Sequence, residues 1–213
     1  MKRLFFSLCQ MLMLFAFLLN GCGPKSVSTG EDNLQPASKA WIPFNGNEVV
    51  VFTLDTMEMV FTGKGKETYY EHVRYKTDQG GFFSSQEDYY GDLERQELIF
   101  ESPSTHYFVK YYLERNKGDM GDWDIFMVSV GDGDYYQNEM KIVTYETSSY
   151  DKGEDYTYQE EKMLNNIVFD SVYYKKQERR PFEVYYTKRQ GVVGFKVSST
   201  ELWTIRIDTL SIH

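Results

Sequence analysis

The stretch "HYFVKYYLE", residues 106–114, sorts its side chains onto the two faces of an extended chain. One face collects aromatic and aliphatic side chains, and the other mixes charged with aromatic ones. The first set is Tyr107, Val109, Tyr111 and Leu113. A period of two is typical of a β-strand, because successive side chains of a strand point to opposite faces. This stretch therefore predicts a strand with one face in a core.

Similar alternation recurs along the rest of the chain, between breaks rich in Gly, Ser and Asp. The expected strands cover residues 48–54, 56–62, 67–75, 96–101, 124–130, 139–147, 182–187, 192–197 and 201–208. The breaks include "TGKGK" (62–66), "NKGDMGD" (116–122), "GDGD" (131–134) and "KRQG" (188–191). No amphipathic helical pattern stands out after the first two dozen residues. The chain is therefore expected to form one antiparallel all-β domain.

Tyrosine occurs on both faces of the expected strands. Six Tyr-Tyr doublets begin at residues 69, 89, 111, 135, 173 and 185. One member of each doublet is expected to face the core, and tyrosine suits the opposite, half-wet position because its ring can be buried while its hydroxyl stays solvated. The pattern predicts a strongly curved sheet or half-barrel with a partly open, aromatic concave face. The candidate ligand contacts are Tyr111, Tyr112, Trp123, Tyr185 and Tyr186.

The amino terminus has the features expected of an export signal. Two basic residues precede an apolar core at residues 11–19, which has signal-peptide length and is shorter than the roughly 20 residues that cross a bilayer. "LNGC", residues 19–22, resembles the lipobox of bacterial lipoproteins, with Asn20 as the one departure. The resemblance implies cleavage after Gly21, diacylglycerol on the Cys22 sulfur and acylation, for example by palmitate, of the new amino terminus. More than one acyl chain gives stable anchoring; an uncleaved signal anchor with a free Cys22 is the alternative.

Three regions follow from this organisation. Residues 1–21 are expected to be the signal peptide, residues 22–40 the acylated cysteine with a flexible tether, and residues 41–213 the antiparallel β domain. By the same resemblance, Gly23 in place of an aspartate after the cysteine favours the outer membrane, on either its periplasmic or its outer face. Loss of Lys2 and Arg3 with the signal peptide moves the formal charge from −9 to −11, which argues against nucleic acid as a partner.

The sequence offers little recognisable catalytic chemistry. The histidines, His72, His106 and His213, have no neighbouring nucleophile motif. Asp122 and Asp124 flank Trp123, and two acids beside an aromatic ring would suit a glycan-processing hydrolase. Calcium is the ion considered, because two nearby Gly-containing turns offer oxygen ligands at Asp119, Asp122, Asp124, Asp132 and Asp134. These turns lack EF-hand spacing and Asp-Gly is also an ordinary hairpin turn, so no catalytic residue and no cofactor is expected.

The last third of the chain carries a second resemblance. "FDSVYY" (169–174), "VYYTKRQGVVGFK" (184–196) and "ELWTIRI" (201–207) are similar to the carboxy-terminal signature of a group of Bacteroidetes envelope lipoproteins of unknown function, and "WIPFNGNEVVVF" (41–52) resembles their first strand. The resemblance implies fold and location and brings no catalytic residue. From the residues themselves, Gly191 predicts a tight hairpin turn, and Gly194 leaves a gap that an aromatic such as Tyr186 could cover.

These observations favour a non-enzymatic function. The expected protein is a lipid-anchored binding or accessory module that presents its aromatic concave face to a lipid, a glycan or a protein. The alternative is the glycan-processing hydrolase with paired aspartates. A hydrolase needs two carboxylates that converge in one cleft, whereas a binding module needs only aromatic faces and polar rims.

Overall fold

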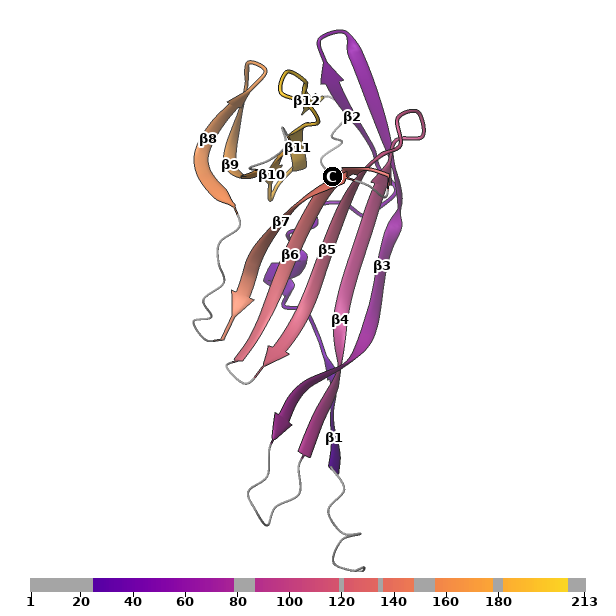
Figure 1. Ribbon diagram of the computed structural model, residues 1–213, viewed down its shortest axis with the longest axis vertical. Helices are drawn as coiled ribbons and strands as arrows, with labels where there is room; N and C mark the ends of the chain where they lie inside the picture. The colour runs from indigo at the N-terminus through magenta and orange to yellow at the C-terminus, as the bar shows by residue number, and fades with distance from the viewer. Residues whose placement is uncertain are drawn as a thin grey trace, which may run out of the picture.

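The computed structural model describes residues 25–78, 87–118, 121–133, 136–147, 156–177 and 182–206. These residues form one strongly curled sheet of 12 strands, a half-barrel in which β1 pairs in parallel with β4 and the other neighbours are antiparallel (Figure 1). The expected all-β, strongly curved fold is therefore confirmed. The predicted signal peptide, with Gly21 and Cys22, lies outside the described residues. Among those described, no helix is both long and apolar enough to span a bilayer.

The elements follow one another with short connections. Their bounds are β1 Lys25–Asp32, α2 Pro36–Lys39, β2 Val49–Leu54, β3 Met57–Asp78, β4 Glu87–Glu101, β5 Tyr107–Gly118, β6 Gly121–Asp132, β7 Tyr136–Glu146, β8 Thr157–Leu164, β9 Ile167–Lys176, β10 Glu183–Thr187, β11 Gly191–Lys196 and β12 Leu202–Ile205. Along the sheet their order is β7-β6-β5-β4-β3-β2-β12-β11-β10-β9-β8. Strands that are neighbours in the sequence are thus mostly neighbours in the sheet. One exception is β12, the last described strand, which pairs with β2.

One predicted turn is wrong. Residues 62–66 lie inside β3, which runs for 22 residues and joins the two strands expected at 56–62 and 67–75. The pairing with β4 shifts between Gly63 and Lys66, so the glycines make a bulge instead of a turn. A side chain at Gly63 would lie 2.3 Å from the carbonyl oxygen of Gly46, so glycine is needed here for a close backbone crossing.

The predicted flexible tether is also wrong for residues 25–40. Residues 25–32 form β1, which pairs with β4 from Lys25–Glu87 to Asp32–Leu93. Beyond β1 the side chains of Leu34 and Ser38 are buried. The composition suggested a tether because large apolar residues are scarce here, but the polar groups of this stretch bind charged partners on the sheet.

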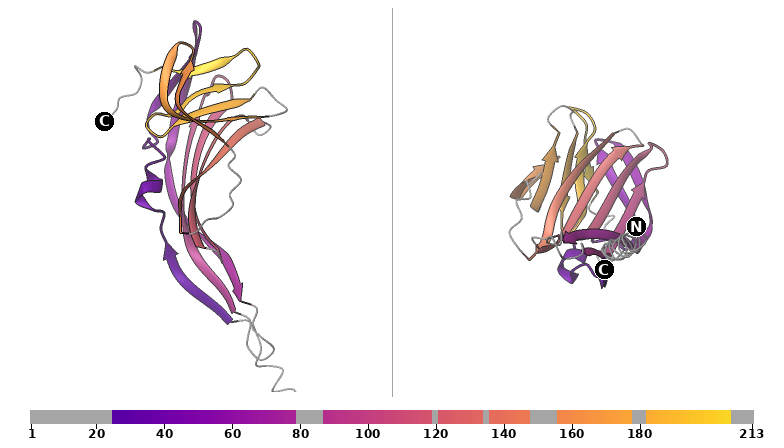
Figure 2. Two further views of the ribbon diagram at one scale, coloured as in Figure 1. Left: turned by 90° about the vertical axis from the view of Figure 1, so that its left-hand side faces the viewer. Right: turned by 60° about the horizontal axis from the view of Figure 1, so that its bottom comes forward.

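The concave face of the half-barrel is filled by residues 33–44, which we call the inner segment. Trp41 packs against Phe126 of β6 and Tyr186 of β10, from opposite walls of the curl, at ring-centroid distances of 5.6 and 6.0 Å. Phe44 packs against Phe100 and Tyr111 at 5.1 and 5.7 Å. The expectation of an open concave face is therefore corrected, because the chain's own aromatic side chains occupy it. Figure 2 shows α2, within this segment, lying beside the sheet.

Charged groups hold the polar end of the inner segment. Glu94 accepts a hydrogen bond from the Leu34 amide at 2.9 Å and pairs with Lys39 at 2.6 Å. Asp124 accepts one from the Gln35 amide, also at 2.9 Å. Glu94 and Asp124 are only 2% and 0% exposed, so these bonds satisfy carboxylates that would otherwise be buried without partners.

Candidate binding groove

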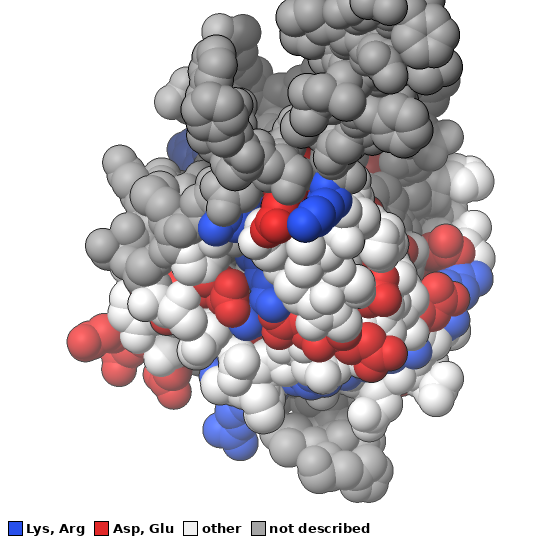
Figure 3. Space-filling view, turned by 90° about the horizontal axis from the view of Figure 1, so that it is seen from below, with Lys and Arg blue, Asp and Glu red and all other residues white. Residues whose placement is uncertain are grey.

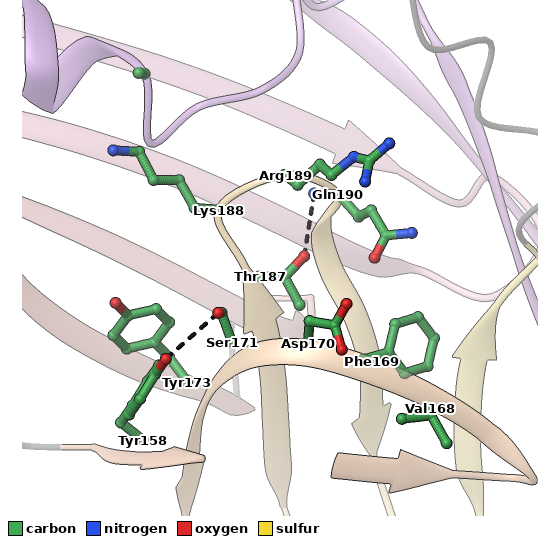
Figure 4. Close-up of a pocket in the computed structure, with 11 residues that line it drawn as sticks. Tyr158, Val168, Phe169, Asp170, Ser171, Tyr173, Thr187, Lys188, Arg189 and Gln190 are labelled. Carbon is green, nitrogen blue, oxygen red and sulfur yellow. Dashed lines mark hydrogen bonds between the residues drawn. The ribbon is translucent and has the colours of Figure 1, made fainter. Parts of the chain in front are cut away.

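A groove with a volume of about 710 Å³ opens between β9 and the turn that follows β10 (Figure 4). Its size suits a small ligand. β8 supplies one lining side chain, β9 supplies five, and the turn at 188–190 supplies three. The lining residues are Ala40, Tyr158, Val168, Phe169, Asp170, Ser171, Tyr173, Thr187, Lys188, Arg189 and Gln190.

Contacts of Thr187 and Gly191 fix the turn at 188–190 against the core. The Gln190 amide donates a hydrogen bond to the Thr187 hydroxyl at 3.1 Å. Gly191 ends the turn with φ of 75°, and a side chain there would lie 2.4 Å from Phe44 Cε2 and 2.7 Å from the Tyr111 hydroxyl. The predicted hairpin turn is thus confirmed, and glycine is required both for its backbone angle and for its close approach to the inner segment.

A tyrosine wall lies at one end of the groove. The rings of Tyr158 and Tyr173 lie 5.0 Å apart, and the Tyr158 hydroxyl donates to Ser171 Oγ at 3.4 Å (Figure 4). Tyr173 also packs edge-on against Trp41 at 5.2 Å, so its ring is fixed by the core. Burial, with smaller contributions from the neighbouring tyrosine hydroxyls, raises the pKa of Tyr173. Its hydroxyl therefore stays neutral and can donate a hydrogen bond at neutral pH.

Charged side chains lie along the rest of the groove. Asp170 is exposed on β9, and Lys188 and Arg189 are exposed on the turn. The Lys188 ammonium lies 5.4 Å from the centre of the Trp41 ring, a cation–π contact. The Arg189 guanidinium, by contrast, forms no ion pair or hydrogen bond with any residue that the structure describes. Figure 4 shows Lys188 and Arg189 leaving the turn in opposite directions.

Three of the predicted ligand contacts are buried in the core instead. Tyr111, Tyr185 and Tyr186 are 2%, 4% and 0% exposed. The Tyr111 hydroxyl accepts a hydrogen bond from the Val192 amide at 3.0 Å, while Tyr185 donates to Glu183 and Tyr186 to the Trp41 carbonyl. Burial raises the pKa of all three hydroxyls. They stabilise the fold and line no part of the groove.

The doublet at 185 departs from the expected pattern because β10 is covered on both faces. Tyr186 faces the inner segment, whereas Tyr185 packs against Tyr174 on the other face, at a ring-centroid distance of 5.7 Å. Tyr185 also lies across from Gly194 and within 4 Å of where a side chain there would begin. The gap above Gly194 is therefore covered by Tyr185 and Leu164, and the expectation that named Tyr186 is wrong.

Tyr112 and Trp123, the other two predicted contacts, are part-exposed but lie on β5 and β6, away from the groove. Tyr112 packs beneath the Lys110 ammonium at 5.6 Å. The Trp123 ring rests on Gly118 across the β5–β6 hairpin, where a side chain would come within 2.8 Å of it. The structure thus does not bring these two aromatic residues together with the turn at 188–190.

The aspartates considered for calcium or hydrolysis serve a different partner. Arg115, 3% exposed, pairs with Asp122 at 3.0 Å, Asp124 at 3.1 Å and Asp32 at 3.2 Å. Asp132 lies at the opposite end of β6, so the two turns are not near each other as expected. Asp119 and Asp134 fall outside the described residues. Within the described ranges, no group of three acidic, His or Cys side chains could hold a metal ion.

The two described histidines belong to β3 and to the connection between β4 and β5. His72 on β3 contacts Asp92 at 2.7 Å and stacks on Tyr90 at a ring-centroid distance of 5.4 Å. His106 ends the connection between β4 and β5, with φ of 60°. Neither histidine lines the groove. His213 lies outside the described residues.

Sequence reasoning missed the groove for a reason visible in its residues. Neither β8 nor β9 is among the strands expected from alternation, and part of β9 enters only as "FDSVYY" in the second resemblance. β8 is an edge strand whose side chains are mostly exposed and polar, so it shows no apolar period. The turn was recognised as "KRQG", and two adjacent cations in an acidic chain were the one signal that could have drawn attention to it. Comparison of the chain with protein-family models, with curated proteins and with solved structures found no match.

Proposed function

We propose that this chain is a lipid-anchored, non-enzymatic binding module of the bacterial cell envelope, and that the groove binds a glycan. The observation that carries the proposal is the tyrosine wall of Tyr158 and Tyr173 beside the polar side chains of Asp170, Ser171 and Gln190. Sugars present both apolar C–H faces and hydroxyl groups. A groove that sets aromatic faces beside a few hydrogen-bonding groups matches both features.

The start of the described chain, at Lys25, and the groove lie at opposite ends of the described structure. β1 begins at Lys25, beside Glu87 at the lower end of the β3–β4 ribbon, whereas β8 to β10 lie at the upper end (Figure 1). Cys22 is three residues before Lys25 in the sequence. The 22 residues of β3 span roughly 70 Å along the strand, at about 3.3 Å per residue. A lipid on Cys22 would therefore hold the groove far from the head groups, where a soluble or cell-wall glycan could reach it.

Charge at the lower end agrees with anchoring by acyl chains. Seen from below, acidic and basic side chains are interspersed among the described residues (Figure 3). A surface of mixed sign gives little net attraction to anionic lipid head groups. The proposed membrane attachment therefore rests on the acyl chains of Cys22 and not on this surface.

The hydrolase with paired aspartates has less support. Asp170 is the one carboxylate among the lining residues, whereas glycoside hydrolysis needs two carboxyls about 5 to 9.5 Å apart. Asp124 is fully buried and paired with Arg115, so it cannot reach a sugar. These features favour binding without chemistry.

The test is a glycan array followed by calorimetry with the best ligand. Tyr158→Ala is expected to weaken binding up to about tenfold, since packing on one aromatic face contributes up to roughly 1.5 kcal/mol. Tyr158 is 47% exposed, so its loss should leave the fold intact. Met163→Ala is the matched control, because Met163 lies on the same strand, is 66% exposed and does not line the groove. Failure of the wild-type protein to bind any glycan would contradict the proposal, as would equal binding by wild type and Tyr158→Ala.

A further inference from the structure

We propose that the groove selects an acidic sugar, and that Arg189 binds its carboxylate. This inference rests on the proposed glycan-binding function and names the class of sugar. The juxtaposition that carries it is an exposed guanidinium at one end of the groove, one carboxylate at its middle and a tyrosine wall at the other end (Figure 4). A uronic acid, with a single carboxylate on a ring of hydroxyls, matches these three features.

Arg189 differs from the other arginines that the structure describes. Those four each pair with a carboxylate: Arg74 with Asp88, Arg95 with Glu71, Arg115 with Asp124 and Arg206 with Glu58. Arg189 forms no such pair within the described ranges, although the chain carries 32 acidic residues against 23 basic ones. A guanidinium fits a carboxylate through two parallel hydrogen bonds. A free guanidinium in a concave site is therefore suited to an acidic ligand.

Lys188 does not share this role. Its ammonium is engaged over the Trp41 ring at 5.4 Å, on the side of the turn away from the Arg189 guanidinium. A lysine also binds carboxylates as a point charge and without the two-pronged geometry of arginine. Lys188 thus gives an internal control: a neighbouring cation in the same turn that contributes charge but faces elsewhere.

Asp170 further restricts the class of acidic ligand that the groove can bind. It lines the same groove and carries a negative charge, so it repels ligands with dense negative charge, such as inorganic phosphate or sulfated chains. The same carboxylate accepts hydrogen bonds from sugar hydroxyls. A sugar that turns its carboxylate to Arg189 and its hydroxyls to Asp170 satisfies both residues, whereas a simple anion satisfies only the first.

The experiment compares acidic sugars with their uncharged methyl esters. Trigalacturonate, triglucuronate and trimannuronate are each titrated into the mature protein by calorimetry, beside the fully methyl-esterified form of the same trisaccharide. For at least one pair, the wild-type protein is expected to bind the acid five- to tenfold more tightly than the ester. Arg189→Gln should lower this ratio to about one, Arg189→Lys should leave part of it, and Lys188→Gln should retain it.

The outcomes separate this inference from the proposed function. If the wild-type protein binds esters and acids equally, or Arg189→Gln keeps the preference for the acid, the inference is overturned and the glycan site stands. If Lys188→Gln removes the preference as fully as Arg189→Gln, the assignment to Arg189 is overturned. If neither these sugars nor any glycan of the array binds, the proposed function itself fails. Inorganic phosphate is titrated alongside, and binding as tight as that of the acidic sugar would overturn the role given to Asp170.

Discussion

Gly191 illustrates how much of the groove depends on single residues. It ends the turn that carries Arg189, and it sits with φ of 75° against Phe44 and Tyr111. The positive angle could be read as an ordinary turn requirement from sequence alone. The second requirement, space for the inner segment, arises from residues more than a hundred positions away in the chain and is visible only in the folded structure.

Replacing Gly191 by Ala should destabilise the protein more than a simple turn glycine would. The added methyl group would begin 2.4 Å from Phe44 Cε2, so the turn or the inner segment must shift. We expect the free energy of unfolding in urea to fall by about 2–3 kcal/mol. Gly133→Ala is the matched control, because Gly133 has φ of 56° and nothing within 4 Å of the added atom, and it should lose only about 1 kcal/mol. Equal losses in the two variants would show that contact with Phe44 does not matter.

At the scale of elements, the inner segment changes what the half-barrel can do. A curled sheet with an empty concave face would expose the aromatic rings of β4, β5 and β6. Trp41 and Phe44 cover them, and the bonds of Glu94 and Asp124 to the backbone of residues 34 and 35 fix the polar end of the segment. The ligand site that we propose is therefore the groove lined by β8, β9 and the turn after β10.

Leu34→Ala tests whether the inner segment belongs to the domain. Leu34 is 3% exposed and part of the core cluster, so truncation should lower the free energy of unfolding by about 2–4 kcal/mol. If residues 25–40 were a flexible tether, the same change would have almost no effect. Met163→Ala, at a site 66% exposed, is expected to change stability by less than about 0.5 kcal/mol in the same urea titration. If the unfolding curves of both Leu34→Ala and Met163→Ala matched that of the wild type, residues 25–40 would be a tether and not part of the domain.

At the scale of the whole molecule, the long β3–β4 ribbon separates the start of the described chain from the groove (Figure 1). If Cys22 is acylated as the lipobox resemblance implies, the lower end faces the membrane. The β8–β10 end then faces away from it, which is the arrangement that a binding module for an external glycan requires.

Cys22→Ala should release the protein from the membrane. Each buried methylene contributes about 0.8 kcal/mol, so loss of the acyl chains removes the whole proposed attachment. After cell lysis and high-speed centrifugation, the variant is expected in the soluble fraction and the wild type in the membrane fraction. Cys9→Ala is the control, because Cys9 lies in the expected signal peptide and should not alter the distribution. A Cys22→Ala protein that still sediments with membranes would favour the uncleaved signal anchor.

The sequence by itself determined β5, whose period of two marks one buried face, and the turn at Gly191 between β10 and β11, because both signals are local. It did not determine β8, since an exposed edge strand has no buried face to mark it. It also predicted Tyr111, Tyr185 and Tyr186 as ligand contacts, although they are buried. The sequence pattern of an aromatic face is the same whether a ligand or another part of the chain covers that face.

Only the tertiary structure decided what covers that face and where a site remains. Leu34, Trp41 and Phe44 reach the concave side through contacts with strands far along the chain, and no local pattern encodes such pairings. The groove likewise joins residues from positions 40, 158–173 and 187–190. Arg189 could be proposed as a ligand contact only from the fold. The fold places its guanidinium at the groove and brings no described carboxylate into an ion pair with it.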